Sequence, residues 1–246
     1  MKDLVLMVTG GAKGIGYAVA QDAARQGAAV LLMDIDEEAL AYAESRLKSE
    51  GAKVCALKTD VTDMTQIKQS VLQGEQELGP VSALVNSAGI APATQYVDIT
   101  PGEWDYVMNV NLKSMFLCVQ AVIEGMKARK SGSIICISSM AGIAGSENAG
   151  AHYCASKAGI IGLVKYLSKA YAKYGITSNV VAPGPVETEM VRKLGEKTKQ
   201  NMLNNMPMRR LGDPREIAAL CTFLCSEKAR FITGAVLEAS GGQIVV

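Results

Sequence analysis

Three side chains in the middle of the chain have the types and spacing for acid–base chemistry on a small molecule. Tyr153 and Lys157 stand four residues apart at the start of a predicted helix, so the phenol and the ammonium share one helix face. Ser139 closes the predicted strand before that helix, at the edge of a parallel sheet where ligands bind. A tyrosine has a pKa of about 10, and nearby positive charge could lower it enough for the phenol to act as a base.

A glycine-rich segment after the first predicted strand has the form of a phosphate-binding loop. Thr9-Gly10-Gly11-Ala12-Lys13-Gly14-Ile15-Gly16 opens a helix, whose free N–H groups and positive dipole end favour a pyrophosphate. Asp34 ends the second predicted strand, where a carboxylate can bind ribose hydroxyls and repel a 2′-phosphate. Lys13 could instead pair with such a phosphate. We weigh Asp34 more heavily because it would occupy the space of the phosphate, which predicts NAD, with NADP less favoured.

The elements that must position these residues alternate between strand and helix along the whole chain. Short β-type runs recur at Leu4 to Val8, Ala29 to Met33, Val54 to Leu57, Ala83 to Val85, Ser133 to Ile137, Thr177 to Val181 and Val236 to Glu238. Apolar residues at three- and four-residue spacing predict helices at Gly14 to Gln26, Glu37 to Glu50, Met64 to Leu78, Leu112 to Arg129, Tyr153 to Tyr174 and Pro214 to Leu224.

This alternation predicts a Rossmann-type α/β fold, a doubly wound parallel sheet of about seven strands with helices on both faces. Residues 1–246 contain no linker or repeat that would mark a second domain, so we expect one dinucleotide-binding and catalytic domain. The stretch 184–206 lacks clear periodicity. Because structureless segments of that length are usually lids, we expect a substrate lid loop there.

The composition disfavours several classes of protein. With 25 Lys plus Arg against 24 Asp plus Glu, the chain has no net field to attract nucleic acid or an anionic membrane. Its apolar runs are shorter than the ~20 residues that a bilayer needs. The six cysteines are dispersed and the chain has one histidine, so we expect reduced thiols, no metal site and a cytoplasmic protein.

Taken together, these motifs resemble the short-chain dehydrogenase/reductase family over essentially the whole chain. The resemblance also rests on Asn86-Ser87-Ala88-Gly89, on Asn111, on Ala182-Pro183-Gly184 and on the terminal Thr233-Gly234 to Gly241-Gly242. It implies that Tyr153 is the acid/base and that Ser139, rather than its neighbour Ser138, orients the substrate oxygen. It further implies that Lys157 holds the nicotinamide ribose and lowers the pKa of Tyr153, and that Asn111 anchors a relay water.

The resemblance implies a row of dinucleotide contacts at the carboxyl ends of the strands. Asp60 would contact the adenine, and the segment after the sixth strand would hold the carboxamide. The full set is Gly10, Lys13, Gly14, Ile15, Gly16, Asp34, Asp60, Val61, Asn86, Ala88, Gly89, Tyr153, Lys157, Pro183, Gly184, Val186 and Thr188. Ser87 departs from the second Asn that is usual in this motif.

Two substrate classes remain open. The C-terminal half resembles the 3-oxoacyl carrier-protein reductases, which usually take NADPH and dock an acidic carrier through basic residues near the entrance. Arg129 and Lys130 could serve as those residues, although Tyr174 stands where another Arg is expected. Glu147 and Asn148, with His152 nearby, offer polar contacts to a hydroxylated substrate beside Ser139 and Tyr153. We therefore predict NAD-dependent oxidation of a small polyol or sugar-type alcohol, with 3-oxoacyl thioester reduction and an acyl carrier partner as the alternative.

The resemblance also implies self-association. Met115, Phe116, Leu163 and Tyr166 extend the apolar surface of two predicted helices beyond one core stripe, and in this family these helices form the dimer face. We expect a homotetramer, or a dimer. A nucleotide-sensing module without turnover is the least favoured alternative, because it would not need Ser139, Tyr153 and Lys157 together.

Overall fold

Seven parallel strands form one sheet in the computed structural model, which describes residues 1–192 and 195–243. The strand order is β3-β2-β1-β4-β5-β6-β7. The strands are Val5–Thr9 (β1), Ala29–Asp34 (β2), Val54–Lys58 (β3), Ala83–Asn86 (β4), Gly132–Ile137 (β5), Ile176–Pro183 (β6) and Val236–Ala239 (β7). The predicted doubly wound parallel sheet is confirmed. Chain order reverses between β1 and β4, and such a switch point opens a ligand crevice at the carboxyl edge.

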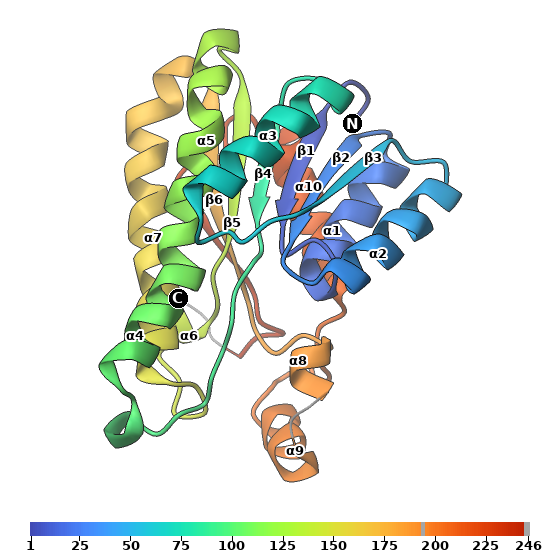
Figure 1. The fold of residues 1–246 in the computed structure, drawn as a ribbon. Coiled ribbons are helices and arrows are strands. Elements are labelled where there is room, and N and C mark those ends of the chain that lie inside the picture. Colours follow the sequence, from blue (N-terminus) through green and yellow to red (C-terminus); the bar gives the residue numbers. More distant parts are fainter. Residues whose placement is uncertain (193–194, 244–246) are drawn as a thin grey trace.

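Helices cover both faces of the sheet, as Figure 1 shows. One face carries α1 (Gly14–Arg25), α2 (Glu37–Ser49) and α10 (Pro214–Cys225), and the other carries α3 (Met64–Leu78), α5 (Ser114–Arg129) and α7 (Ala151–Tyr171). The strands are apolar on both sides because both faces are covered. In β1, for example, Leu6 packs into one core cluster and Met7 into the other, and both are fully buried.

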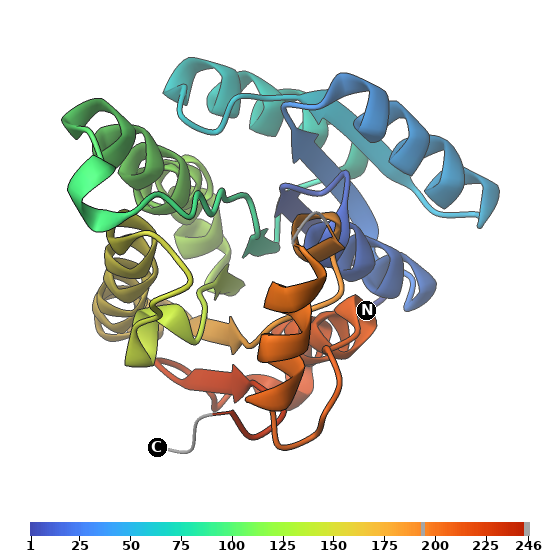
Figure 2. The ribbon, with the colours of Figure 1, turned by 90° about the horizontal axis from the view of Figure 1, so that it is seen from below.

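The predicted lid loop contains two short helices, α8 (Glu189–Arg192) and α9 (Glu196–Asn204). Residues 193–194 of the predicted segment lie outside the described residues. The sequence of α9 is mostly polar, so it has no apolar stripe to reveal its helical period. Both helices project from the carboxyl edge of the sheet, and Figure 2 shows them from that side.

A continuous helical run over 101–129 joins three elements: α4 (Pro101–Met108), the π-helical turn η2 (Asn109–Lys113) and α5. The run is long and apolar enough to cross a membrane by length and composition alone, but half of its most apolar window is buried inside the protein. It packs against α7 as a core helix does. We expected Met115 and Phe116 to extend the apolar surface of this run. Met115 is instead buried in the core, whereas Phe116 is exposed.

The remaining elements are short. They are the single turns η1 (Tyr96–Asp98), α6 (Ala141–Ala144), η3 (Ala172–Tyr174) and η4 (Glu227–Ala229). Of these, α6 lies between β5 and α7 and begins two residues after Ser139, so it sets the path of the chain as it leaves the sheet.

Candidate active site

The glycine loop and the segment after β4 lie against each other at the switch point. The Thr9 hydroxyl accepts hydrogen bonds from the backbone N–H groups of Ser87 (3.2 Å) and Ala88 (3.3 Å). A Cβ on Gly10 would lie 2.8 Å from the backbone of Ala88, and one on Gly16 would lie 2.1 Å from the Gly10 carbonyl. Only glycine at these positions lets the backbone segments pack this closely, which shapes the loop at the N-terminus of α1.

The N-terminus of α1 is built to receive an anion from outside the chain. Asp36, Asp63, Thr100 and Asp213 cap the N-termini of α2, α3, α4 and α10 with side-chain acceptors. In α1, Lys13 makes no side-chain cap and no acidic residue lies in the first turn. Its free N–H groups and dipole suit the pyrophosphate of a dinucleotide, so the residues present fit the cofactor that the sequence implies.

Four charged side chains lie near the predicted ribose position: Asp34, Asp36, Lys13 and Glu189. Asp34 accepts hydrogen bonds from the backbone N–H groups of Ala12 and Asp36 (both 3.1 Å), which fix its carboxylate beside the glycine loop. The Lys13 ammonium donates to Asp36 (2.7 Å) and lies 3.6 Å from Glu189 at the start of α8. Sequence analysis gave Asp36 no role, although its place two residues after Asp34 was a usable signal.

Ser139 and Tyr153 meet beyond the end of β5. The Ser139 side chain lies close enough to the Tyr153 phenol to lower its pKa, and its oxygen accepts a hydrogen bond from the backbone N–H of Ala141 (3.1 Å). Ser138 points the other way, is buried, and donates to the Lys157 carbonyl (2.7 Å). The two serines thus have separate surroundings, and Ser139 is the one that lies beside Tyr153.

We expect the alanine variants of Ser139 and Ser138 to lose different properties, turnover in the first and stability in the second. Ser139→Ala should lower kcat by about 10- to 100-fold with little change in stability, because it removes a hydrogen bond at the reacting oxygen. Ser138→Ala should instead destabilise the fold by about 1 kcal/mol, because it removes a buried hydrogen bond to the Lys157 carbonyl. Steady-state rates and urea unfolding measure the two effects. A larger loss of turnover in Ser138→Ala would overturn the assignment.

Lys157 lies in the interior behind Tyr153. It is 5% exposed, its ammonium donates to the Ile137 carbonyl (3.0 Å), and it stands 5.6 Å from the centre of the Tyr153 ring. Burial lowers the pKa of Lys157 to about 8. Burial also raises the pKa of Tyr153 and outweighs the hydrogen bond with Ser139, which lowers it. Burial thus opposes the lowering of the Tyr153 pKa that we expect from Lys157 and a bound nicotinamide ring together.

Asn111 is buried in the π-helical turn, a type of bulge that recurs at functional sites. Its amide protons go to the Ile90 carbonyl (2.9 Å) and the Ser156 hydroxyl (3.0 Å), and its Oδ1 accepts from the Ile90 N–H (2.8 Å). A relay water could therefore bind only to the second lone pair of Oδ1. A Cβ on Gly89 would lie 3.2 Å from this Oδ1 and 3.4 Å from the Lys157 ammonium, so Gly89 leaves space beside both groups.

The other predicted dinucleotide contacts lie along the same edge. Asp60 follows β3, where its carboxylate accepts from the backbone and hydroxyl of Thr62, and Val61 is buried in the core beside it. Asn86 ends β4, and its buried Oδ1 has no hydrogen-bond partner among the described residues. Ile15 occupies the first turn of α1, partly buried against the core.

The chain after β6 closes over the glycine loop. Gly184 donates to the Ala239 carbonyl (3.0 Å), just beyond Pro183 at the end of β6, and Val186 is buried where its backbone bridges to Gly212. The Thr188 methyl would lie 3.4 Å from a Cβ on Gly14. The start of α8 therefore rests directly on the loop that the pyrophosphate would occupy.

The polar residues predicted to bind a hydroxylated substrate are not arranged around Tyr153. Glu147 and Asn148 are exposed on the loop between α6 and α7. Within the described part of the chain, no hydrogen bond joins either side chain to Ser139 or Tyr153. His152 is fully buried and hydrogen-bonded inside the protein, so it is not a substrate contact.

The basic residues predicted near the entrance lie at the opposite edge of the sheet. Arg129 ends α5 and donates to the Val81 carbonyl (2.5 Å), which precedes β4, and Lys130 follows in a left-handed conformation. Tyr174 belongs to the turn before β6 at that same edge. The expectation that Arg129 and Lys130 flank the active site is therefore wrong within one copy of the chain.

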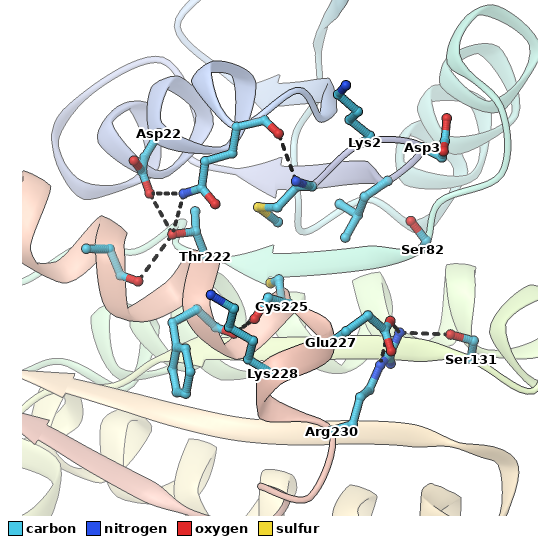
Figure 3. Close-up of a pocket in the computed structure, with 16 residues that line it drawn as sticks. Lys2, Asp3, Asp22, Ser82, Ser131, Thr222, Cys225, Glu227, Lys228 and Arg230 are labelled. Atoms are coloured by element: carbon cyan, nitrogen blue, oxygen red, sulfur yellow. Dashed lines mark hydrogen bonds and ion pairs between the residues drawn. The ribbon is translucent and has the colours of Figure 1, made fainter.

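A cavity of about 820 Å³ also lies at that amino-terminal edge, away from the predicted site (Figure 3). Its walls include Leu4, Ser82 and Ser131, each of which directly precedes a strand. Arg230 crosses the cavity to Glu227 and Ser131. The cavity contains none of the predicted catalytic or dinucleotide-binding residues.

Comparisons with known proteins agree with this geometry. A family model described as Enoyl-(Acyl carrier protein) reductase matches residues 10–243. The chain is 39% identical to the 3-oxoacyl-[acyl-carrier-protein] reductase FabG of Thermotoga maritima, covering 98% of both chains. It is also 39% identical to the acetoacetyl-CoA reductase of Synechocystis, covering 99% of this chain and 97% of that one.

A solved structure extends the agreement to three dimensions. The 3-oxoacyl-[acyl-carrier protein] reductase from Brucella melitensis superposes with a TM-score of 0.94 at 30% identity, covering 99% of this chain and 92% of that one. The fold, the phosphate cradle and the Ser139–Tyr153–Lys157 arrangement thus occur together with full-length similarity to reductases. The chain belongs to the short-chain dehydrogenase/reductase family of nicotinamide-dependent oxidoreductases.

Proposed function

We propose that this protein catalyses the nicotinamide-dependent interconversion of 3-oxoacyl and 3-hydroxyacyl thioesters. The observation that carries the proposal is the placement of the Tyr153 phenol beside Ser139, with its ring centre 5.6 Å from the Lys157 ammonium, at the sheet edge where the dinucleotide cradle opens. The printed activities of the reductases to which the chain is similar support the thioester class. The polyol prediction depended on Glu147, Asn148 and His152; His152 is buried, and Glu147 and Asn148 are exposed, so the structure adds no support to that prediction.

In the reductive direction, the chain supplies the proton and positions the carbonyl. A bound reduced nicotinamide supplies the hydride to the carbonyl carbon. Tyr153 donates its phenolic proton to the carbonyl oxygen, and the Ser139 hydroxyl donates a hydrogen bond to the same oxygen. The raised pKa of Tyr153 keeps a proton on the phenol at neutral pH, so that the proton is present for transfer. Lys157 places its positive charge beside the phenolate that remains, which favours proton release.

We expect NAD(H) to be preferred over NADP(H), although the resembling reductases usually take NADPH. Asp34 is fixed beside the glycine loop, and the Lys13 charge is matched by Asp36 and Glu189, so a 2′-phosphate would meet net negative charge. The kcat/KM with NADH should exceed that with NADPH by about tenfold or more.

Two substitutions of Asp34 separate the effect of its charge on the preference for NADH over NADPH from the effect of the space that its side chain fills. Asp34→Asn keeps the size of the side chain and removes its charge, so it should shift the ratio partway towards NADPH. Asp34→Ser also opens room for the phosphate and should shift it further. A native enzyme that prefers NADPH would contradict the cofactor proposal.

A substrate panel tests the thioester class. Acetoacetyl thioesters of coenzyme A and of an acyl carrier protein should be reduced faster than small ketoses, and 3-hydroxyacyl thioesters should be oxidised faster than polyols. Initial rates with both dinucleotides measure the comparison. Activity confined to polyols or sugars would overturn the thioester proposal and restore the earlier prediction.

The exposed faces of α5 and α7 bear on self-association. Phe116 on α5 and Tyr166 on α7 are 49% and 65% exposed, which supports association of these helices between copies in a homotetramer or dimer. An acyl carrier protein is the partner that the activity would need if the acyl group is carried on a protein rather than on coenzyme A. We retain a lid role for the 184–206 segment, and a cytoplasmic location for the protein.

A further inference from the structure

His152 lies beneath the start of α7 with both ring nitrogens engaged. Its Nδ1 is 2.9 Å from the backbone nitrogen of Tyr153, its Nε2 is 3.2 Å from Glu103 Oε1, and its side chain is fully buried. We propose that His152 is a positioning residue for Tyr153, and that Glu103 and Thr94 hold its imidazole in the form this requires. The proposal rests on the proton-donor role of Tyr153 in the proposed function.

The hydrogen bonds fix which tautomer is present. A backbone N–H can only donate, so Nδ1 accepts from Tyr153 and the proton lies on Nε2, which donates to Glu103. The Thr94 hydroxyl donates to the same Glu103 oxygen (2.5 Å). Hydrogen bonds from Thr94 and His152 lower the pKa of Glu103, which keeps it a carboxylate that can only accept.

The N-terminus of α7 needs the acceptor that His152 Nδ1 provides. Tyr153 is the third residue of α7, and an N–H in the first turn has no partner within the helix. The capping residue is Gly150, which has no side chain to offer, so the imidazole takes the place of a cap. A Cβ on Gly150 would lie 2.2 Å from His152 Cε1, so the glycine leaves room for the ring to fold back under the helix.

Three segments therefore converge on the backbone of the proton donor. Thr94 comes from the segment after β4, Glu103 from α4 and His152 from α7. The Gly150 N–H also donates to the Pro92 carbonyl (3.2 Å), which ties the start of α7 to the same segment. Because Tyr153 reaches Ser139 only if the first turn of α7 is held in place, loss of the imidazole should misdirect the phenol.

A pair of variants at position 152 separates positioning from simple burial. His152→Asn keeps an acceptor at about the place of Nδ1, whereas His152→Leu fills space without one. We expect kcat to fall about 10- to 100-fold in His152→Leu and to stay within about threefold of native in His152→Asn, with the KM for the dinucleotide little changed in both.

Titration of the phenol gives a readout that needs no substrate. Ultraviolet difference spectra of each variant, against the same variant carrying Tyr153→Phe, report the titration midpoint of Tyr153. It should move to higher pH in His152→Leu, because the hydrogen bond with Ser139 that lowers it is weakened, and stay in place in His152→Asn. This result would stand even if the native protein reduced none of the thioesters tested.

A second pair keeps the test informative if His152→Leu does not fold. Glu103→Gln still accepts from Nε2–H, whereas Glu103→Leu does not, and the Glu103 side chain is 26% exposed and so tolerates change. We expect Glu103→Leu to lower kcat several-fold and Glu103→Gln to restore it. Equal kcat values and equal titration midpoints within each pair would overturn the proposal.

Discussion

Tyr153→Phe should lower kcat by about 1,000-fold on any substrate that the native enzyme turns over. The substitution removes only the phenolic hydroxyl, and proton transfer from a positioned side chain typically contributes 10²- to 10⁴-fold. The hydroxyl lies beside Ser139, and among the described residues no hydrogen bond joins it to the backbone, so stability should change by about 1 kcal/mol or less. Steady-state rates, unfolding curves and dinucleotide titration measure the three properties.

Tyr166→Phe is the matched control for this experiment. Tyr166 lies on the same helix, α7, but its side chain is 65% exposed, so the variant should keep native rates. Dinucleotide affinity should remain within a few-fold of native in both variants. If Tyr153→Phe kept native turnover, the acid role would be wrong, and a nucleotide-sensing module would become the better description.

Lys157→Met should stabilise the fold while it removes most of the activity. Burial lowers the pKa of Lys157 from 10.5 to about 8, so keeping this ammonium charged at pH 7 costs about 3 kcal/mol of folding free energy at 1.36 kcal/mol per pH unit. Methionine has a similar length and no charge. After the loss of the hydrogen bond to the Ile137 carbonyl, we expect a net gain of about 1–2 kcal/mol at pH 7.

The sign of this effect should depend on pH. Between about pH 8 and 10.5 the unfolded chain binds a proton at Lys157 that the folded chain does not, so native stability rises with pH across that interval. The advantage of Lys157→Met should therefore be greatest below pH 8 and disappear near pH 10.5. Urea unfolding at pH 7 and pH 10 measures it, with the exposed Lys165→Met as control. A variant less stable than native at pH 7 would contradict this account.

Sequence periodicity predicted the long elements because each buries an apolar face. All seven strands and the six long helices lie within a few residues of their predicted bounds. The elements that were missed, α4 and α9 among them, lack such a face. For α4 a different signal was present, since Thr100 before Pro101 has the sequence of a helix start, and the Thr100 hydroxyl accepts from the Glu103 N–H.

The order of motifs along the chain predicted which residues gather at the carboxyl edge, but not their electrostatics. The expected lowering of the Tyr153 pKa took account of charge and omitted burial, which dominates here. Likewise, the conflict between Asp34 and Lys13 could not be resolved from spacing, because it depends on Asp36 turning back to the glycine loop. Such pairings are set by tertiary contacts, which no local pattern encodes.

The contacts of Lys13 with both Asp36 and Glu189 join two parts of the chain that the cofactor proposal treats separately. One ammonium lies beside the glycine loop and also faces the first residue of α8. A substitution at position 13 chosen to admit NADP would therefore also remove a contact of α8. If the 184–206 segment serves as the lid we propose, we expect such a variant to change the KM of the carbonyl substrate together with the cofactor preference, and the two properties should be measured together.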